Sequence, residues 1–187
     1  MSKYTHISSA TTTTLIQAAD YSTNSSTNKI ASNKINVSKI SITNFSTHAD
    51  GATVKVWLDG LIMTRTVNQG SSTTAKIIFD QENYVSDTDR IEVGDYVYDS
   101  DTTLHGFIRT LNPDSDNTKE ILISASVAIT NDETLSIQRP DHYITGVVTI
   151  PTGVTLVLDD PFFMNLRNHS LKIINTGTNP DLTVRID

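Results

Sequence analysis

Carboxylate pairs are the residues of this sequence whose spacing most directly suggests chemistry. Oxygen ligands gathered in one loop are what Ca²⁺ prefers, and the residues from Asp114 to Thr118 resemble the start of an EF-hand loop. That loop requires Gly at its sixth position, which is Lys119 here, and Glu at its twelfth position, where this sequence has another residue. Asp also begins ordinary turns between strands. Turns are therefore the favoured interpretation, calcium binding is the alternative, and no metal ligand is assigned. The three Asp-x-Asp pairs are Asp87/Asp89, Asp99/Asp101 and Asp114/Asp116.

The histidines do not form a recognisable catalytic or metal-binding pattern. None of the five falls in a spacing that would place two rings on one helix face. The chain has no cysteine, which removes thiolate chemistry and disulfide bonds. We therefore predict no catalytic residue, no cofactor-binding residue and no enzymatic activity. The five are His6, His48, His105, His142 and His169.

Aromatic residues are the better candidates for contact sites. Trp57 alternates with Val54 and Val56, so it lies on the opposite face of a predicted strand. Phe162 and Phe163 follow Pro161 and form the main aromatic pair of the chain. We predict that Trp57, Phe162 and Phe163 are packing anchors at a subunit interface. Further aromatic residues, which on an exposed sheet could stack on sugars or anchor a partner, are Tyr84, Tyr96, Tyr98 and Tyr143.

Composition favours an all-β protein. The chain contains 28 Thr, 19 Ser and 14 Asn among 187 residues, and 37% of its residues are hydrophobic. Branched side chains such as Thr, Val and Ile favour pleated backbone, whereas Asn, Ser and Gly favour turns. No apolar stretch is long enough to cross a bilayer, so we predict no membrane contact.

Charge divides the chain into three segments. The formal net charge is −7, which argues against nucleic-acid binding. Residues 81–140 hold twelve Asp and Glu against four Lys and Arg, whereas residues 1–80 hold four against seven. We predict an acidic inserted β domain at 81–140 and a discontinuous β-sandwich formed by 1–80 and 141–187.

Local patterns predict particular strands and turns. Asp59-Gly60 between two apolar strands predicts a two-residue type I′ hairpin, because both central positions need positive φ. Ile35 and Val37 lie on the opposite phase from Ile40 and Ile42, which predicts a β-bulge within one long strand over residues 29–45. Residues 1–30 are expected to form a pliable arm that orders against a neighbouring molecule.

Together these patterns predict an antiparallel two-sheet sandwich of about eight strands, jelly-roll-like, with a small inserted β-barrel or sandwich. About five short strands in 60 residues bring the insert near the lower limit for an independent core.

Several phrases resemble a known class of protein. The chain resembles β-rich virion structural proteins of tailed bacteriophages of the myovirus type from marine bacteria. The resemblance lies in the C-terminal phrases YITGVVTIPTGVTLVLDDPFF, SLKIINTG and PDLTVRI, and in HISSATTTTLIQA and VSKISITNFSTHADGATVKVWLDG near the start. The segment GDYVYDSDTTLHGFIRTLNPDSDNTKEILISASVAITNDETLSI is similar to a small β module of phage tail and fibre proteins.

The resemblance implies a non-catalytic component of a phage particle: a head decoration, neck or collar, or tail accessory protein. It would assemble in the host cytoplasm, reside in the virion, form a homo-oligomer and contact other virion proteins of capsid, neck or tail. The alternative is a glycan-recognition or host-recognition module of a tail fibre or baseplate. A third hypothesis, a polysaccharide-active β-helix enzyme, rests on VTIPTGVTLVLDD, but we find no repeat of the period that solenoids show.

Overall fold

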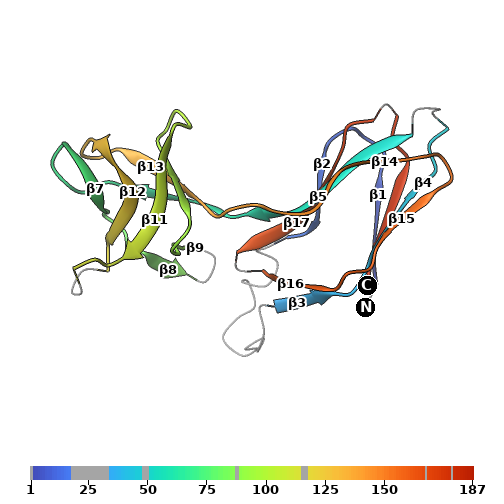
Figure 1. Ribbon diagram of the computed structural model, residues 1–187, viewed down its shortest axis with the longest axis horizontal. Coiled ribbons are helices and arrows are strands. Elements are labelled where there is room, and N and C mark those ends of the chain that lie inside the picture. The colour runs from blue at the N-terminus through green and yellow to red at the C-terminus, as the bar shows by residue number, and fades with distance from the viewer. Residues whose placement is uncertain are drawn as a thin grey trace. The chain divides into compact units, whose positions relative to one another are not determined.

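We analysed a computed structural model of the 187-residue chain. It describes residues 2–17, 34–47, 51–86, 89–114, 118–166, 168–177 and 179–187, and within 84–89 only the backbone. All regular structure in these residues is β-strand (Figure 1). No helix long and apolar enough to span a membrane occurs among them.

The chain forms two compact units. The first unit comprises residues 1–59 and 141–187, and the second unit comprises residues 60–140. Each unit has its own cluster of buried hydrophobic side chains. The second unit is therefore an insertion, and the chain leaves the first unit after Asp59 and re-enters it at Asp141.

The first unit is an antiparallel sandwich of two four-stranded sheets. One sheet has the order β1-β18-β4-β15, and the other has the order β14-β5-β17-β2. A separate two-stranded sheet pairs β16 with β3. The strands are β1 (Lys3–Ile7), β2 (Thr12–Ile16), β3 (Lys34–Val37), β4 (Ile40–Asn44), β5 (Ala52–Gly60), β14 (His142–Ile150), β15 (Thr155–Leu158), β16 (Phe162–Asn165), β17 (His169–Asn175) and β18 (Leu182–Ile186).

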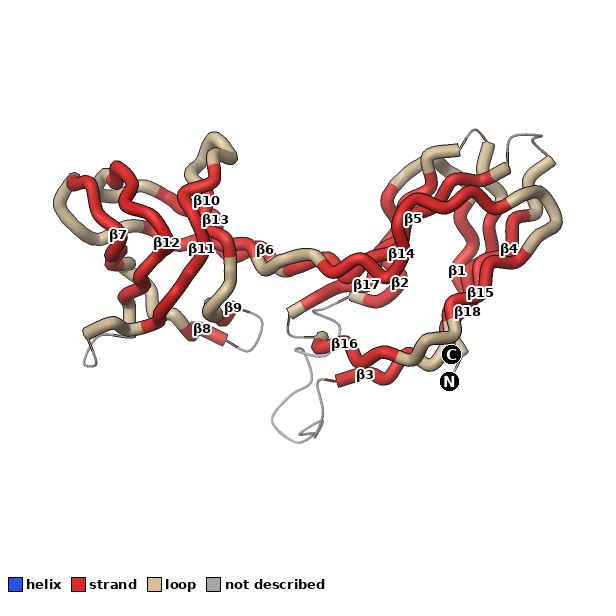
Figure 2. The backbone as a smooth tube through the Cα atoms, viewed as in Figure 1, coloured by secondary structure: helices blue, strands red, loops and turns tan. Residues whose placement is uncertain are grey.

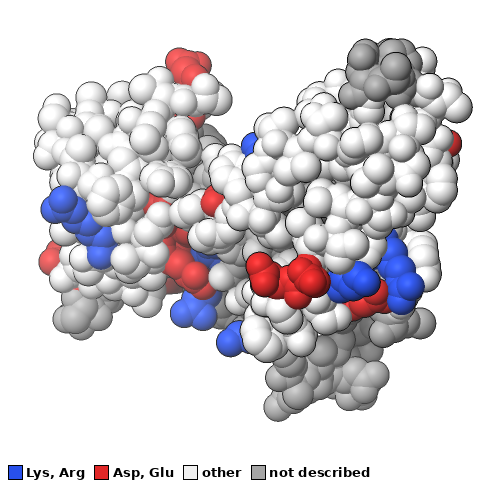
Figure 3. Space-filling view, turned by 45° about the vertical axis from the view of Figure 1, so that its right-hand side comes forward, with Lys and Arg blue, Asp and Glu red and all other residues white. Residues whose placement is uncertain are grey.

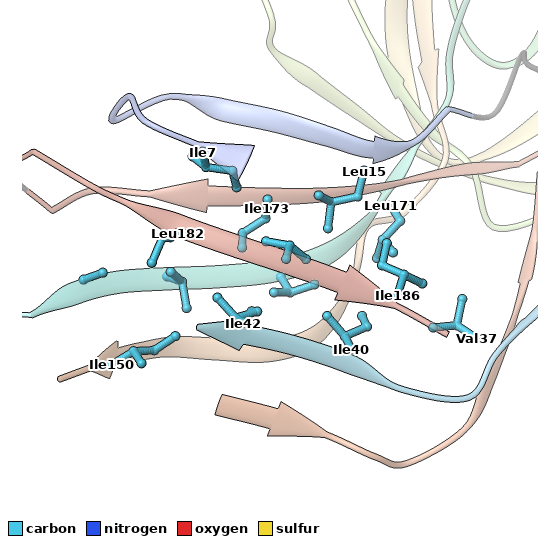
Figure 4. Close-up of a cluster of buried hydrophobic side chains, with 14 of the residues drawn as sticks. Ile7, Leu15, Val37, Ile40, Ile42, Ile150, Leu171, Ile173, Leu182 and Ile186 are labelled. Atoms are coloured by element: carbon cyan, nitrogen blue, oxygen red, sulfur yellow. The ribbon is translucent and has the colours of Figure 1, made fainter. Parts of the chain in front are cut away.

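Alternating apolar residues from both sheets form the core of this sandwich (Figure 4). Ile40 and Ile42 of β4 face inward from one sheet, and Leu171 and Ile173 of β17 face them from the other. Because strand side chains alternate between faces, these four residues are buried, whereas Ser41 and Lys172 between them are partly exposed on the other face of each sheet. The predicted all-β, antiparallel two-sheet sandwich is confirmed.

The predicted β-bulge between residues 35 and 42 is wrong. β3 ends at Val37 and β4 begins at Ile40, and the two strands belong to different sheets. Ser38 and Lys39 form the break, where both backbone N–H groups are directed to the carbonyl oxygen of Asp187. The change of phase therefore marks a strand that leaves one sheet for another.

The prediction of a pliable N-terminal arm is also wrong for the residues of it that the structure describes, 2–17. β1 pairs with β18 over its whole length, and β2 pairs with β17. Ile7 and Leu15 are buried in the core of the sandwich. Residues 18–30, the remainder of the expected arm, lie outside the described part of the chain.

The second unit is built on a six-stranded antiparallel sheet with the order β6-β13-β10-β11-β12-β7. An isolated bridge between Val67 and Phe79 and a hydrogen bond from the N–H of Asn68 to the carbonyl of Ile78 link the two outermost strands, so the sheet curls toward closure. The strands are β6 (Ile62–Thr66), β7 (Ser72–Ile78), β10 (Tyr96–Tyr98), β11 (Leu104–Leu111), β12 (Glu120–Ile129) and β13 (Thr134–Gln138), with a small pair, β8 (Tyr84–Ser86) and β9 (Asp89–Arg90).

The boundary between the units differs from the predicted one at its N-terminal side. Residues 60–80 belong to the second unit, because β6 pairs with β13 and β7 pairs with β12. The charge count misplaced this boundary, since residues 60–80 contain few charged side chains and so resemble the first unit. The C-terminal bound of the predicted insert, residue 140, is also the last residue of the second unit.

The predicted hairpin at Asp59-Gly60 is wrong. β5 continues through Gly60, and β6 begins two residues later without pairing with β5. Gly60 is not among the glycines with positive φ, which a type I′ turn would require. Leu58 is opposite His142, and Ile62 is opposite Gln138, so the partners of both strands come from the returning chain.

Candidate functional site

Of the three carboxylate pairs, the structure describes both members of Asp99/Asp101, and this pair forms a turn. Asp99 Oδ1 accepts hydrogen bonds from the N–H groups of Asp101 (2.9 Å) and Thr103 (2.8 Å), which is the usual arrangement at an Asp-initiated turn. Asp114 forms an ion pair with Lys76 on β7. Asp87 and Asp116 lie outside the described residues. Over the described residues no three His, Asp or Glu side chains are placed to share a metal ion.

The Asp99 turn has a pH dependence of defined sign. The backbone hydrogen bond from Thr103 is the main cause that holds the pKa of Asp99 below its ordinary value of 3.8. Because the folded pKa is lower than the unfolded one, Asp99 contributes stability above pH 3.8, and this contribution is lost as the pH falls through the folded pKa.

We expect Asp99→Asn to remove this titration while keeping the side-chain oxygen that accepts both N–H groups. Denaturant unfolding at several pH values between about pH 5 and pH 2 measures the effect. The wild-type protein should lose more stability across this range than Asp99→Asn. Asp99→Ala should be less stable than both at neutral pH, since it lacks the acceptor. Equal pH profiles for wild type and Asp99→Asn would contradict the prediction.

The histidines lie in separate places. His6 Nε2 is 2.9 Å from Asp181 Oδ1 at an exposed position. The rings of His142 and His169 have centroids 5.1 Å apart, and His105 Nε2 is 4.0 Å from Glu133 Oε1. His48 is outside the described residues.

The three predicted interface anchors have different environments. Trp57 is 9% exposed, and its Nε1 donates to Asp59 Oδ1 at 3.1 Å. Lys55 Nζ lies 5.4 Å from the Trp57 ring centroid and 4.1 Å from that of Tyr143, so the ammonium group lies over both rings. Phe162 is half-buried and packs against the core. Phe163 is 73% exposed. Of the three side chains, Phe163 is the one that is largely exposed, whereas Trp57 is buried and Phe162 is half-buried.

Further apolar side chains are exposed on β14 and β15, the two strands joined by the turn that begins at Pro151. β14 is an outermost strand of its sheet and carries Tyr143 and Val147, the latter 72% exposed. β15 is an outermost strand of the other sheet and carries Val157, with Val154 just before it. β14 has no Lys, Arg, Asp or Glu, the residues that commonly protect strand edges. We call Tyr143, Val147, Val154 and Val157 the β14–β15 edge.

The two units carry very different charge. The second unit holds thirteen Asp and Glu against six Lys and Arg, whereas the first unit holds eight of each. The whole formal charge of −7 therefore belongs to the second unit. In the view of Figure 3, Lys, Arg, Asp and Glu of the first unit gather in a band along its lower margin, and most of its remaining visible surface is uncharged.

A shallow groove lies on the outer face of the sheet in the second unit. It has a volume of about 410 Å³ and is formed by β6, β13, β10 and the turn after β10. The three strands are consecutive in the sheet order and are labelled in Figure 2. Tyr98 supplies the aromatic ring in its lining. We call it the Tyr98 groove; it is lined by Ile62, Thr64, Tyr98, Asp99, Ser100, Thr102, Thr134, Ser136 and Gln138.

A second hollow of the same unit, about 430 Å³, has Asn83 in its lining. Asn83 Nδ2 donates to Asn112 Oδ1 at 2.7 Å and to the carbonyl of Glu120 at 2.8 Å. Its backbone N–H donates to the carbonyl of Thr118. These bonds join the segment before β8 to the segment between β11 and β12, so the donors of Asn83 are committed to holding the fold together.

Sequence reasoning noted Tyr96 and Tyr98 but missed the residues that surround them. Alternation around Val97 places both tyrosines on one face, and this signal is visible in the sequence. Gln138, Ser136 and Thr64 could not be assigned to the same surface, because they come from strands that are distant along the chain.

Comparisons with protein families, with curated proteins and with solved structures find no match for this chain.

Proposed function

We propose that this protein is a non-catalytic structural component of a phage particle, in the class of head decoration, neck or collar, and tail accessory proteins. It would act through protein–protein contacts in a symmetric assembly with other virion proteins. The observation that carries the proposal is the set of exposed apolar side chains of the first unit, which comprises the β14–β15 edge and Phe163 on β16. Phe163 and Val147 are the most exposed of them. The sequence resemblance described above supplies the phage setting.

The physical argument begins with what these side chains can do. Exposed apolar residues on a rigid sheet favour association, because burying them removes apolar area from water. The first unit has equal numbers of acidic and basic residues, so copies that meet through it experience little net repulsion. Repetition around a symmetry axis then builds a large interface from one small patch.

The chain's packing agrees with such a role. Two separate buried cores and continuous antiparallel sheets hold the exposed side chains at fixed positions. Because little conformational entropy is left to lose, binding through preordered strands is favoured over binding through a mobile segment.

Two substitutions on the first unit test this proposal. We expect Phe163→Ser and Val147→Lys each to weaken incorporation into particles by about tenfold, the effect of losing one central apolar anchor. The measurement is the copy number of the tagged chain in purified phage particles, by quantitative mass spectrometry. Val93→Lys, at a 61% exposed position in a turn of the second unit, is the matched control and should leave the copy number unchanged.

Three outcomes would overturn the proposal. The chain could be absent from purified particles, or both first-unit variants could be incorporated as well as wild type. The third is an equal loss for the Val93→Lys control, which would show that the effect does not depend on the first unit. Circular dichroism of each purified variant shows that a lowered copy number does not result from misfolding.

A further inference from the structure

The Tyr98 groove has the composition of a binding site for a hydroxyl-rich ligand. Most of its lining side chains carry a hydroxyl group, and Gln138 adds an amide. Hydroxyl and amide groups both donate and accept hydrogen bonds, so they match ligands that do the same at many positions. A volume of about 410 Å³ falls within the range of small-molecule sites.

Strand register places these side chains in ordered rows across the sheet. One row runs from Ile62 through Gln138 and Tyr96 to Phe107, because each residue is directly opposite the next on the neighbouring strand. The next row runs from Thr64 through Ser136 and Tyr98 to Leu104.

Each row therefore begins at β6, crosses β13 and ends in aromatic or apolar side chains of β10 and β11. Directly opposite residues on neighbouring strands lie about 5 Å apart, so polar groups and rings are within reach of one extended ligand.

The aromatic side of the groove offers a surface for stacking. Tyr98 lines the groove, and its ring centroid is 6.4 Å from that of Tyr96 just outside the lining, with the two rings inclined by 62°. Phe107, also outside the lining, lies opposite Tyr96 and is exposed, with the Arg109 guanidinium 6.0 Å from its ring centroid. An exposed ring covers the apolar C–H face of a sugar, while neighbouring hydroxyl and amide groups bind its polar edge. This combination favours a saccharide over a ligand that is only apolar.

Charge further restricts the ligand. Asp99 is the one ionisable carboxylate in the lining, and no Lys or Arg lines this groove. The surrounding unit is strongly acidic. Sialylated, sulfated or phosphorylated chains would therefore be repelled, and nothing in the lining would neutralise them.

Backbone strain occurs at the edge of the groove. Thr102 has φ of +69°, a left-handed conformation that a β-branched residue rarely adopts. It is held there by the turn that Asp99 organises, since the N–H of Thr102 donates to the carbonyl of Asp99 at 3.3 Å. Such strain persists where the surrounding structure requires one conformation, and binding sites are a common setting for it.

We infer that the Tyr98 groove binds a neutral oligosaccharide, with Tyr98 stacking on a sugar ring and Gln138, Ser136 and Thr64 binding its hydroxyl groups. This inference does not depend on the role of the first unit in particle assembly. It develops the recognition alternative that the sequence left open.

The experiment uses the full chain and a glycan array that carries neutral, sialylated, sulfated and phosphorylated saccharides. The neutral saccharide with the strongest signal is then titrated by isothermal calorimetry. We expect binding to neutral chains only. Tyr98→Ala and Gln138→Ala should each weaken it by about tenfold, whereas Tyr98→Phe should retain most of it because the ring remains.

Tyr143→Ala is the control, because Tyr143 is an exposed tyrosine of the first unit. It should bind the saccharide as wild type does. The inference is overturned if no neutral saccharide binds, if only anionic ones bind, or if Tyr143→Ala weakens binding as much as Tyr98→Ala. It is also overturned if an unrelated peptide displaces the saccharide from the Tyr98 groove with higher affinity.

Thr102→Gly separates binding from folding at the same site. Glycine adopts positive φ without strain, so this variant should be at least as stable as wild type in denaturant unfolding. It loses the hydroxyl and methyl groups that line the groove, and saccharide binding should fall by about threefold or more. A stable Thr102→Gly protein with undiminished affinity would exclude Thr102 from the site.

Discussion

Gly60→Ala is expected to destabilise the second unit severely. A Cβ atom at position 60 would lie 1.9 Å from the carbonyl oxygen of Arg139 and 2.6 Å from its carbonyl carbon. Both of these atoms belong to the backbone, so no side-chain rotation can relieve the clash. The two chain segments would have to separate, which would break the hydrogen bond from the N–H of Arg139 to the carbonyl of Leu61.

We expect a loss of about 3 kcal/mol in the free energy of unfolding, at the upper end of the cost of overpacking. Denaturant unfolding followed by circular dichroism measures this loss. Gly70→Ala is the matched control, because a Cβ there meets no atom within 4 Å and should change stability by no more than about 0.5 kcal/mol. Equal stability of the two variants would show that the two strands separate without cost.

Removal of either partner from the buried ion pair between Asp95 and Arg139 is the second change with a large expected effect. Arg139 Nε and Nη2 each lie 3.0 Å from a carboxylate oxygen of Asp95, a two-pronged arrangement. The side chains are 2% and 5% exposed. Arg139 Nη2 also donates to the carbonyl of Arg90 at 2.8 Å, and Asp95 Oδ2 accepts the N–H of Glu92.

Loss of Arg139 leaves the Asp95 carboxylate buried without a cation, and loss of Asp95 leaves Arg139 with only the partly exposed Glu92 carboxylate, whose Oε2 lies 3.6 Å from Nη2. Breaking a buried pair of this kind costs about 3–5 kcal/mol. We therefore expect Asp95→Ala and Arg139→Met each to lower the stability of the second unit by this amount. The double variant should lose clearly less than the sum, because it leaves neither charge uncompensated. A double-mutant cycle in denaturant unfolding measures the coupling. Additive losses would show that the two side chains act separately.

The sequence contains much of the information about individual strands, because burial imposes a period of two. The alternation in the sequence predicts strands over Thr134–Gln138 and Leu182–Ile186, and these are the bounds of β13 and β18 in the structure. In both strands, alternate Leu, Ile or Val side chains enter a core while Ser, Thr or a charged residue lies outside. Such alternation is a property of the strand alone, so it is readable without knowledge of its partners.

Pairing between strands could not be predicted in the same way. The strand after Asp59 has the composition of a returning hairpin strand, yet its partner is β13, which begins at Thr134. The turn propensity of Asp59-Gly60 was outweighed by the pairing of β6 with β13. No short-range sequence pattern indicates which strand will be the partner. The strand Phe162–Asn165 was likewise missed, since its partner, Lys34–Val37, is distant in sequence.

The candidate binding surface was predictable to a smaller extent. Tyr96 and Tyr98 share a face by alternation alone. Their neighbours Gln138 and Thr64 join them only through the order β6-β13-β10, which brings together three segments of the second unit. Exposure also follows from tertiary structure, as Trp57 shows: it lies on the outer face as predicted, but Lys55 covers its ring.

The way the chain passes between its two units has a consequence for how such a protein can be rebuilt. Leu58 and His142 are opposite each other on paired strands, so the points where the chain departs and returns are about one strand spacing apart, near 5 Å. Deletion of residues 61–140 would leave Asp59, Gly60 and Asp141 as a three-residue loop between these two arms. The acidic unit is thus inserted at the turn of the β-hairpin formed by β5 and β14. We expect that another domain with closely spaced termini could replace it without a change in the strand order of the sandwich.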